Sequence, residues 1–467
     1  MRILFTNEGT YPHVMGGVST WCDQLVHGLS EHEFHLLAVT GPLAVKPAYT
    51  LPKNVTRLDT AHLWGPRKGL RRAGREQSEA FGAQLSSLLR FVDGDLGSFG
   101  QGLYTLAQAG THHNVWPLFE TEAAWREVRY ALVRLLGRTP KLVETTLALN
   151  WLRASLAPLL FIPQEVDLAH TTANGLAAIP ALLAAKTYGA PLLLTEHGVY
   201  LRERYLAFGA EDDVPGVRLL RARFHRAVAQ LMYKEADRLL SVSEFNRRWQ
   251  LELGAPVERT RVIYNGVEPG AFPAADGGVQ KVPTVSWVGR IDPLKDLETL
   301  IRSFSAVRAV LSDARLKLYG PVPQGNEGYF AKLEQLVRQL SLERNVSFEG
   351  PISPVHKAYH AADVVVLSSV SEGFPYTPIE AMMCAKPVVA TRVGGVGEAI
   401  GDSGKLVEPR QPEELGRALS ELLLDASLRQ ALGAAARERA LQHFTLSDMN
   451  GAYGQVYGEL GTLGRAA

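Results

Sequence analysis

The sequence predicts an α/β protein built of two domains, each with a parallel β-sheet covered by helices. Its 467 residues are too many for one ordinary domain and suit two of about 200 each. Short apolar segments alternate with helical periodicity in both halves, which is typical of parallel sheets. A stretch rich in Gly, Pro and Ala, residues 265–283, separates the two series. We therefore expect Rossmann-like domains at residues 1–268 and 269–445 that face each other across a cleft, and a C-terminal helix at about 446–467 packed on the first domain.

The first domain opens with the order strand, glycine loop, helix. Ile3–Thr6 is a short apolar strand, Gly16 and Gly17 form the loop, and Val18–Leu29 has helical periodicity. The next strand is Phe34–Thr40. The later strands of this domain are expected at 167–172, 191–195, 238–243 and 261–264, with helices at about 175–188 and 217–235.

Residues 60–160 interrupt this alternation and show few strand signals. They contain three stretches with helical periodicity: 76–92, 122–136 and 142–160, the last broken at Pro158. We expect them to form a mostly helical insertion in the first domain. After the linker, the second domain begins a new α/β series, with strands expected at 284–288, 316–319, 346–349, 363–368 and 387–391.

Composition excludes several classes of protein. Hydrophobic residues make up 46% and charged residues 21%, as in ordinary soluble proteins, and the formal net charge of +1 gives no bias toward nucleic acid. The two cysteines, Cys22 and Cys384, lie too far apart in sequence to suggest a disulfide framework or a zinc site. We find no apolar run near the ~20 residues of a membrane span. We expect a cytoplasmic protein, with peripheral attachment to the inner membrane left open.

The most informative stretch follows the strand at 363–368. It runs from Ser371 to Ala381, SEGFPYTPIEA, and contains two acids, Glu372 and Glu380, around a Gly-Phe-Pro turn. Thr377 is placed to be a helix N-cap with Glu380 three residues later, which predicts a capping box. The same helix N-terminus would offer N–H groups and partial positive charge to a diphosphate.

This spacing of acids resembles the E-x7-E motif of the family 4 glycosyltransferases, a family with the GT-B fold. The resemblance covers most of the chain. The strand at 285–288 leads into Gly289-Arg290 and then Lys295, and the resemblance implies that Arg290 and Lys295 bind the diphosphate of a nucleotide-sugar donor. Physically, a guanidinium and an ammonium neutralise the charge that grows on the leaving phosphate.

Further residues take their expected roles from the same resemblance. Glu372 and His197, which ends a strand in Leu194-Thr195-Glu196-His197-Gly198, are the candidate catalytic residues that orient the transferred sugar. Glu380 is expected to bind the donor ribose. The remaining donor-binding candidates are Gly16, Gly17, Gly373 and Phe374. A second glycine loop, residues 393–398, follows the strand at 387–391, and a plain tight turn is the alternative there.

Finer features are similar to the subfamily that makes the Pel exopolysaccharide of biofilms. They are Glu8-Gly9-Thr10-Tyr11-Pro12, the segment Gly16–Trp21, Thr195–Tyr200 and Arg202-Glu203-Arg204. This resemblance implies a UDP-sugar donor, a growing glycan as acceptor, and inner-membrane synthase subunits as partners. The family retains the anomeric configuration, which the sequence alone could not have shown.

No metal or other cofactor is expected. Asp93-Gly94-Asp95 has the DxD spacing by which other glycosyltransferases hold a divalent cation, but it lies in a glycine-rich loop without strand context. Two alternatives stay open: a nucleotide-sugar 2-epimerase, which would need no acceptor, and a non-catalytic nucleotide-sugar-binding subunit of a synthase complex. A Rossmann oxidoreductase loses support because no G-x-G-x-x-G follows the first strand.

Overall fold

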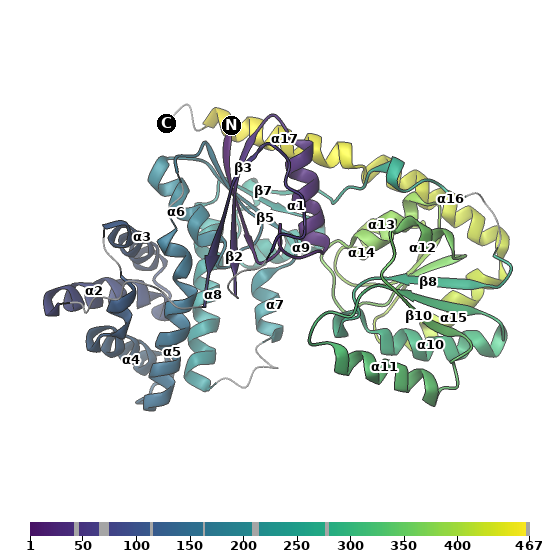
Figure 1. Ribbon diagram of the computed structural model, residues 1–467, viewed down its shortest axis with the longest axis horizontal. Coiled ribbons are helices and arrows are strands. Elements are labelled where there is room, and N and C mark those ends of the chain that lie inside the picture. Colours follow the sequence, from purple (N-terminus) through teal and green to yellow (C-terminus); the bar gives the residue numbers. More distant parts are fainter. Residues whose placement is uncertain are drawn as a thin grey trace. The chain divides into compact units, whose positions relative to one another are not determined.

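The computed structural model describes residues 1–41, 46–64, 74–112, 115–161, 164–207, 214–275 and 280–463. Within these ranges the chain divides into two compact units (Figure 1). Unit 1 comprises Met1–Ser241, Arg247–Val262 and the segment from Tyr453 onward, and unit 2 comprises Val242–Asn246 and Ile263–Ala452. Each unit contains one parallel β-sheet with helices, so the predicted fold class is confirmed at this level.

The sheet of unit 1 has the strand order β3-β2-β1-β4-β5-β6-β7, with every neighbouring pair parallel. Its strands are β1 Arg2–Glu8, β2 Glu33–Thr40, β3 Val55–His62, β4 Leu168–Thr171, β5 Leu192–Glu196, β6 Arg238–Ser241 and β7 Thr260–Val262. In the central strand β1, Ile3 pairs with Phe34 on one side and with Leu168 on the other. Residues 3–7 are all buried, because helices cover both faces of the sheet.

The helices that lie wholly or mostly in unit 1 are α1 Gly17–Gly28, α2 Arg75–Leu88, α3 Leu96–His112, α4 Glu122–Leu136, α5 Leu142–Ser155, α6 Ala178–Tyr188, α7 Tyr200–Ala207, α8 Pro215–Glu235, α9 Glu244–Glu252 and α17 Leu446–Leu463. The group α2–α5 lies beside α8 and is the predicted helical insertion (Figure 1). Helix α4 illustrates why these segments are helical: Thr121 caps its start by accepting from Ala124 N–H, and Gly137 ends it in the left-handed region at φ 65°.

The sheet of unit 2 has the strand order β10-β9-β8-β11-β12-β13 and is also parallel throughout. Its strands are β8 Thr284–Val288, β9 Arg315–Tyr319, β10 Val346–Gly350, β11 Val364–Leu367, β12 Val388–Thr391 and β13 Lys405–Val407. Its helices are α10 Leu297–Val310, α11 Glu327–Gln339, α12 His356–His360, α13 Tyr376–Met383, α14 Val396–Ile400, α15 Pro412–Leu424 and α16 Ala426–His443. Strand β11, VVVL, is fully buried, as a central parallel strand should be.

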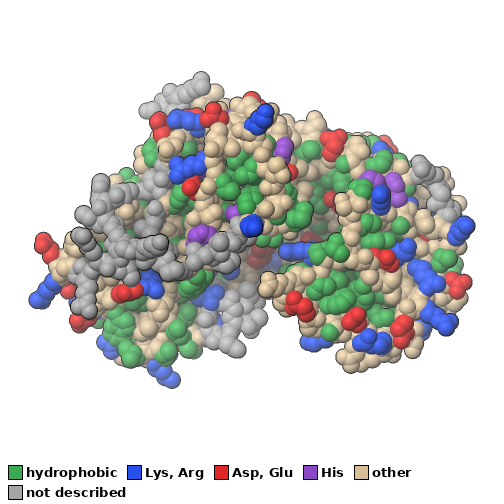
Figure 2. All heavy atoms as spheres, viewed as in Figure 1, with side chains coloured by type: hydrophobic (Ala, Val, Ile, Leu, Met, Phe, Trp, Pro, Cys, Tyr) green, Lys and Arg blue, Asp and Glu red, His purple; other side chains and the backbone are tan. Residues whose placement is uncertain are grey.

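Short 3-10 helices complete the described elements: η1 Leu89–Asp93, η2 Trp116–Glu120, η3 Ala157–Leu160, η4 Val257–Arg259, η5 Pro269–Ala271 and η6 Pro293–Lys295. Among the described residues no helix is both long enough and apolar enough to cross a membrane. Basic and acidic side chains are interspersed over the face shown in Figure 2, in keeping with the formal net charge of +1.

Two elements of unit 1 differ from the sequence expectations for physical reasons. Strand β3 was not expected, because it is an edge strand whose partly exposed residues include Arg57 and Asp59 instead of an apolar run. Helix α3 was expected to begin as a glycine-rich loop. A Cβ atom at Gly102 would lie 2.6 Å from Leu88 Cα, so glycine allows α3 to pack closely against the end of α2.

Candidate functional site

The predicted donor-binding residues of unit 2 come together at the carboxyl ends of β8 and β11. These strands are neighbours at the point where the strand order changes direction, the place where α/β sheets bind ligands. The loops that follow them are joined: the Ser368 hydroxyl donates to the Lys295 carbonyl at 2.7 Å, and Val370 N–H donates to the Leu294 carbonyl at 2.9 Å. Lys295 and Glu372 are therefore held on two adjoining loops.

Lys295 and Glu372 form an ion pair at the exposed edge of this loop cluster. Lys295 Nζ lies 2.6 Å from Glu372 Oε1, and the Ser369 hydroxyl donates to the same oxygen at 2.5 Å. The two side chains are 23% and 10% exposed, so solvent can reach the ammonium. The ion pair orients a cation at the carboxyl edge of the sheet, where an incoming anion could replace Glu372.

Arg290 differs from Lys295 in having no hydrogen bond or ion pair with any residue of the described ranges, and its side chain is exposed. Its backbone position is nevertheless fixed. Gly289 N–H donates to the Tyr319 carbonyl at 3.0 Å, and Ile291 N–H donates to the Pro321 carbonyl at 2.9 Å. A rigid loop thus presents an unpaired guanidinium, which is suited to bind phosphate oxygens.

Gly373 and Phe374 have structural contacts. The Phe374 side chain is buried in the core of unit 2, with its ring centroid 5.0 Å from that of Tyr264. The Gly373 carbonyl accepts from Gly395 N–H at 2.8 Å, joining this loop to the second glycine loop. Gly394 has φ +54°, and a Cβ there would lie 1.8 Å from the Glu372 carbonyl oxygen. Both loops approach each other by their backbones. The Phe374 carbonyl accepts from the Asn265 side-chain amide at 2.8 Å, so the backbone N–H of Phe374 is the group left for a ligand.

Glu380 lies on α13, and its local structure corrects the predicted capping box. Helix α13 begins at Tyr376, so Thr377 is inside the helix and its hydroxyl donates to the Val288 carbonyl at 3.2 Å. The Glu380 carboxylate accepts from the Tyr359 hydroxyl instead of the backbone. The capping box was wrong because Pro375 takes the N-cap position two residues earlier. Burial raises the pKa of Glu380 to about 7, although the Tyr359 hydrogen bond opposes the shift.

Glu398, at the end of the second glycine loop, was not predicted as a functional or capping residue. Its carboxylate accepts from the backbone N–H groups of Glu244 at 2.6 Å and Phe245 at 2.7 Å. It therefore caps the first turn of α9. No local sequence signal could have found this contact, because 154 positions separate Glu398 from Glu244.

In unit 1, Gly16 and Gly17 lie at the N-terminus of α1, as predicted. Gly16 is the N-cap, with extended backbone at φ 169°, and nothing lies within 4 Å of the place where its Cβ would be. The first turn contains no acidic residue and receives no side-chain cap. The helix start therefore keeps the partial positive charge of its N–H groups, which suits an anion.

His197 follows β5 at the carboxyl edge of the unit 1 sheet. Its ring centroid lies 4.4 Å from that of Trp21 on α1, in an edge-to-face arrangement at 65°. Burial lowers the pKa of His197 to about 3, so the imidazole is neutral at physiological pH. A neutral ring can donate one hydrogen bond and accept another, but it contributes no charge to a ligand.

A pocket of about 350 Å³ lies next to His197 and contains residues that were not predicted as a site. It is lined by Glu8, Thr10, Val18, Thr172, Ala173, His197, Gly198, Tyr200, Glu203 and Arg204. Glu8 Oε1 accepts from Leu176 N–H and from the Tyr200 hydroxyl, and Glu8 Oε2 lies 3.6 Å from the Arg204 guanidinium. Glu8 could have been suspected from its position, because it ends the first strand at the switch between β1 and β4.

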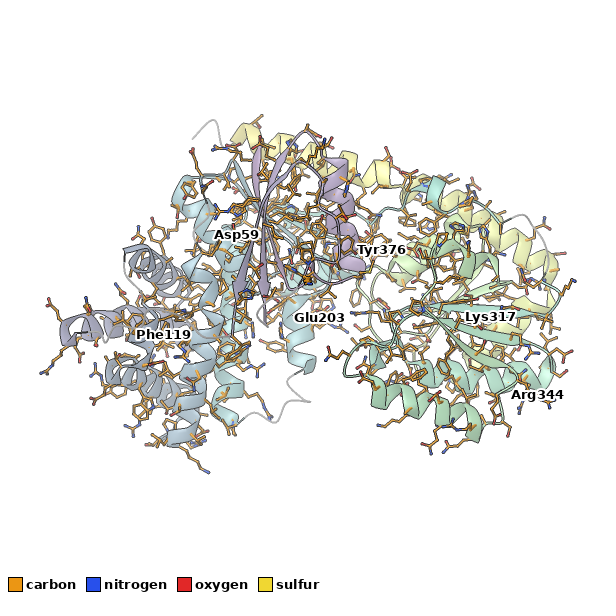
Figure 3. The ribbon with its side chains drawn as sticks, viewed as in Figure 1. Asp59, Phe119, Glu203, Lys317, Arg344 and Tyr376 are labelled. Atoms are coloured by element: carbon orange, nitrogen blue, oxygen red, sulfur yellow. The ribbon has the colours of Figure 1, made fainter. Side chains whose placement is uncertain are left out.

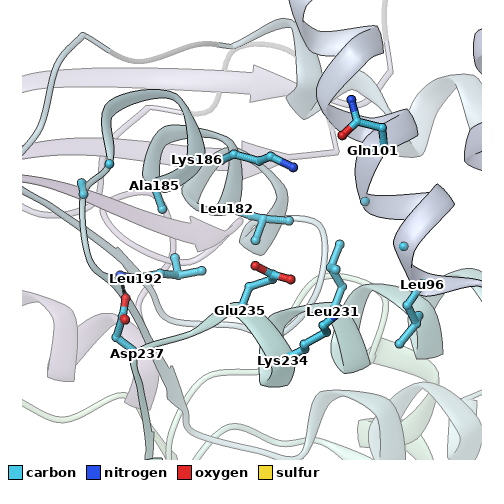
Figure 4. A pocket seen from close by; sticks show the side chains of 14 residues that line it. Leu96, Gln101, Leu182, Ala185, Lys186, Leu192, Leu231, Lys234, Glu235 and Asp237 are labelled. Atoms are coloured by element: carbon cyan, nitrogen blue, oxygen red, sulfur yellow. Dashed lines mark hydrogen bonds between the residues drawn. The ribbon is translucent and has the colours of Figure 1, made fainter. Parts of the chain in front are cut away.

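A second pocket of unit 1, of about 360 Å³, lies among α3, α6 and α8 (Figure 4). Leu182 and Leu231 form part of its apolar lining, and Lys186, Glu235 and Asp237 add charges. It lies near the amino ends of β5 and β6, at the opposite edge of the sheet from the candidate site. It includes none of the residues predicted for function.

The DxD-like segment has structural partners. Asp93 Oδ1 lies 3.2 Å from the Arg134 guanidinium, and Asp95 accepts from the backbone N–H of Ser98 at the start of α3. Across the described ranges no group of three or more His, Cys, Asp or Glu residues could hold a metal ion. Metal independence itself stays a prediction.

Comparison with known proteins places these two units in context. Residues 1–258 match the sequence model of a domain of unknown function, DUF3492, and residues 274–439 match that of the glycosyl transferases group 1. The chain belongs to the DUF3492 family, whose model spans more than half of it. The chain is 33% identical to a D-inositol 3-phosphate glycosyltransferase of Catenulispora acidiphila over 52% of its own length and 59% of that protein. It is 34% identical to one of Kineococcus radiotolerans over 45% and 54%. It therefore aligns with little more than half the length of these curated relatives.

Solved structures show the fold class of this chain. The Anabaena protein Alr3699/HepE, solved in complex with UDP, aligns over 98% of this chain and 100% of that one, with a TM-score of 0.66 and 18% identity. Sucrose-phosphate synthase from Thermosynechococcus elongatus aligns over 99% of both chains, with a TM-score of 0.65 and 19% identity. These similarities confirm the GT-B fold class that the sequence predicted.

Proposed function

We propose that this protein is a glycosyltransferase that moves a sugar from a nucleotide-sugar donor, whose diphosphate binds in unit 2, to a glycan acceptor. The observation that carries the proposal is the juxtaposition of Arg290 with the Lys295–Glu372 ion pair at the carboxyl ends of β8 and β11. Two cations at a sheet edge, one of them unpaired in the described structure, suit a diphosphate. The match of residues 274–439 to the model of the glycosyl transferases group 1 supports the same assignment.

The donor is proposed to be a UDP-sugar. The Anabaena protein with this fold was solved with UDP, with UDP-glucose, and with UDP and glucose. Those ligands belong to that protein, at 18% identity. They favour uridine for this chain without identifying the sugar, so the donor panel below includes other bases.

The chemistry follows from charge. When the sugar leaves, negative charge grows on the diphosphate, and Lys295 and Arg290 stabilise it. Lys295 must exchange its contact with Glu372 for one with phosphate, which frees the Glu372 carboxylate to accept from hydroxyls of the transferred sugar. We propose transfer with retention: the acceptor oxygen bonds to the anomeric carbon as the bond to phosphate breaks, and the acceptor proton passes to the leaving phosphate. No protein base is needed in this scheme.

The proposal also includes roles for Glu380 and His197, independence of metal, and a biological role. Glu380 is expected to accept hydrogen bonds from the ribose hydroxyls, and His197 to contact the transferred sugar. Transfer is proposed to be independent of metal and to serve synthesis of an exopolysaccharide of the Pel type, beside inner-membrane synthase subunits. The Pel assignment rests on Glu8–Pro12, Thr195–Tyr200 and Arg202–Arg204. The curated relatives act on a different acceptor, according to their names.

The experiment that tests the proposal is a thermal-shift screen of the purified chain against UDP-, GDP- and ADP-sugars, with EDTA present. A ligand that binds only the folded state raises the melting temperature by mass action. A shift with one nucleotide class that survives EDTA, and that disappears in Lys295→Ala, is the expected result. A shift that requires added Mg²⁺ or Mn²⁺ would contradict the metal-independent site.

Product analysis separates the proposal from its two rivals. A 2-epimerase would convert the donor alone into an epimer, whereas a transferase would release the nucleoside diphosphate only by transfer or by slow hydrolysis. A non-catalytic binding subunit would melt at a higher temperature when the donor is added, but it would form neither the epimer nor the nucleoside diphosphate. The expected result is release of nucleoside diphosphate that increases when a saccharide acceptor is added.

A further inference from the structure

The pocket beside His197 carries a further inference about the acceptor, which rests on the proposed function. We propose that this pocket of unit 1 binds the acceptor as an uncharged sugar residue, through the carboxylates of Glu8 and Glu203, and discriminates against phosphorylated acceptors. Such a preference would set this chain apart from the relatives named as inositol phosphate glycosyltransferases.

The pocket is a built feature of unit 1. Its volume of about 350 Å³ falls in the range of small-molecule pockets, about 300–1,000 Å³. Two glycines allow lining side chains of the pocket to pack closely against the backbone. A Cβ at Gly198 would lie 2.0 Å from Glu203 Oε1, and a Cβ at Gly175 would lie 2.2 Å from the Tyr200 ring. Any larger residue at either position would displace a lining side chain.

Charge inside the pocket favours a neutral ligand. Its described lining contains two carboxylates, Glu8 and Glu203, and one cation, Arg204. Arg204 is already engaged, because its guanidinium lies 3.6 Å from Glu8 Oε2 and 4.8 Å from the centroid of the Tyr200 ring. Burial raises the pKa of both carboxyl groups, and the charge of Glu8 adds to the rise in the pKa of Glu203. A phosphate dianion here would face like charges in a desolvated place.

The same groups suit sugar hydroxyls. Carboxylate oxygens accept hydrogen bonds, and Thr10, Thr172 and Tyr200 supply hydroxyls that donate or accept. Glu203 comes from the first turns of α7 and lies near the strand ends of unit 1 (Figure 3). Glu8 comes from the end of β1. Acids from two separate elements can therefore bind two hydroxyls of one sugar ring.

Matched acceptors give the sharpest test. The pairs are methyl glucoside with its 6-phosphate, and myo-inositol with D-inositol 3-phosphate, each assayed for transfer and, without donor, for binding by calorimetry. The neutral member is expected to have at least a tenfold higher kcat/KM and tighter binding. The variants Glu8→Gln and Glu203→Gln keep the shape and remove the charge. Each is expected to raise the KM for the neutral acceptor roughly tenfold and to narrow the preference over the phosphorylated one.

Controls separate this inference from the proposed function. Glu235→Gln, at the other pocket of the same unit, should leave the acceptor preference unchanged (Figure 4). A normal donor-induced melting shift in Glu8→Gln and Glu203→Gln shows that these variants fold. Preference for the phosphorylated acceptor, or an unchanged preference in both variants, would overturn the inference while donor binding still stood. Binding of the neutral acceptor without any nucleotide-sugar binding would instead contradict the proposed function alone.

Discussion

At the scale of single residues, the contact between Lys295 and Glu372 predicts what removal of each partner does. Lys295→Ala removes the cation proposed to stabilise the leaving diphosphate, and we expect kcat/KM to fall about 10²- to 10³-fold in a folded protein. The matched control is Lys317→Ala, on β9 of the same unit (Figure 3). Steady-state kinetics and a melting curve measure both effects. Near-normal kcat in Lys295→Ala would refute the assigned role.

The buried carboxyl group of Glu196 predicts a pH dependence of stability. It accepts from the Tyr233 hydroxyl at 2.8 Å and from the Gln250 amide at 2.9 Å, yet burial raises its pKa to about 7. Because the folded state then binds more protons than the unfolded state, the free energy of unfolding falls as the pH rises from about 4.5 to about 7. The slope reaches about 1.4 kcal/mol per pH unit.

The variant Glu196→Gln removes this titration while its amide oxygen can still accept from both partners. Its stability relative to the wild type, measured by urea denaturation, should increase from pH 5 to about pH 7 and then level off. Glu252→Gln, an exposed acid of the same unit, should show no such trend. A constant difference between Glu196→Gln and the wild type over this range would contradict the raised pKa of Glu196.

The sequence predicted individual site residues unevenly. Arg290, Lys295 and Glu372 lie in the loops that follow β8 and β11, so strand detection and a motif were enough to place them at one sheet edge. Glu8 and Glu203 were missed as site residues because their meeting depends on β1 and α7 packing together, and α7 was not expected. Such contacts between elements distant in sequence leave no local periodicity to detect.

At the scale of elements, glycines hold the donor loops at distances that no side chain allows. Gly320 has φ +141°, and a Cβ there would lie 1.7 Å from the Gly289 carbonyl oxygen, in the loop that presents Arg290. Gly320→Ala should therefore lower the free energy of unfolding by roughly 2–4 kcal/mol. Gly328→Ala is the matched control, because it lies in helix α11 with nothing within 4 Å of its Cβ.

Chemical denaturation measures this difference. Gly328→Ala should be neutral or slightly stabilising, by up to about 1 kcal/mol, because alanine has the higher helix propensity. The Gly320→Ala variant could be folded at room temperature and yet show no rise in melting temperature when the donor is added. That result would show that the loop also positions Arg290. Equal stability of the two variants would mean that the loop relaxes without cost.

Strands that are buried on both faces were predictable from the sequence, and strands that are partly exposed were not. The central strands β1, β8 and β11 are apolar on both faces, and the sequence located each within a residue or two. The edge strand β3 and the short strand β13 lack that pattern. The start of helix α3 was not predicted for a different reason. Its glycines allow close packing against α2, but glycines are also typical of loops, so the sequence could not distinguish the two.

At the scale of the whole molecule, unit 1 includes residues from both ends of the described chain. The Tyr457 hydroxyl and His170 Nδ1 share a hydrogen bond of 2.8 Å. The ring centroid of Tyr453 lies 5.3 Å from that of Trp21. Both tyrosines are fully buried. Residues 1–268 expressed alone should therefore bind hydrophobic dyes and melt with poor cooperativity. Residues 446–467 supplied as a peptide should restore a cooperative melt.

The control for that experiment is the same peptide with Tyr453 and Tyr457 replaced by alanine, which should not restore the melt. Circular dichroism and dye fluorescence follow both samples. If the fragment 1–268 alone melted as cooperatively as it does with the peptide, α17 would be dispensable for the core of unit 1. The predicted boundary at residue 268 would then describe an independently folding domain.

The return of α17 to unit 1 has a consequence for how the chain is made. A nascent chain leaves the ribosome amino end first, so β1 and Trp21 are outside long before Tyr453 has been translated. The 190 residues of 263–452 must be added in between, which takes roughly 10–40 s at about 5–20 residues per second. Throughout that interval unit 1 lacks its last helix, whereas by its end all residues of unit 2 have been made. Unit 2 can therefore finish folding before unit 1, although unit 1 is translated first. Until α17 is made, the surface around Trp21 and His170 is exposed, and this is where a chaperone would be needed.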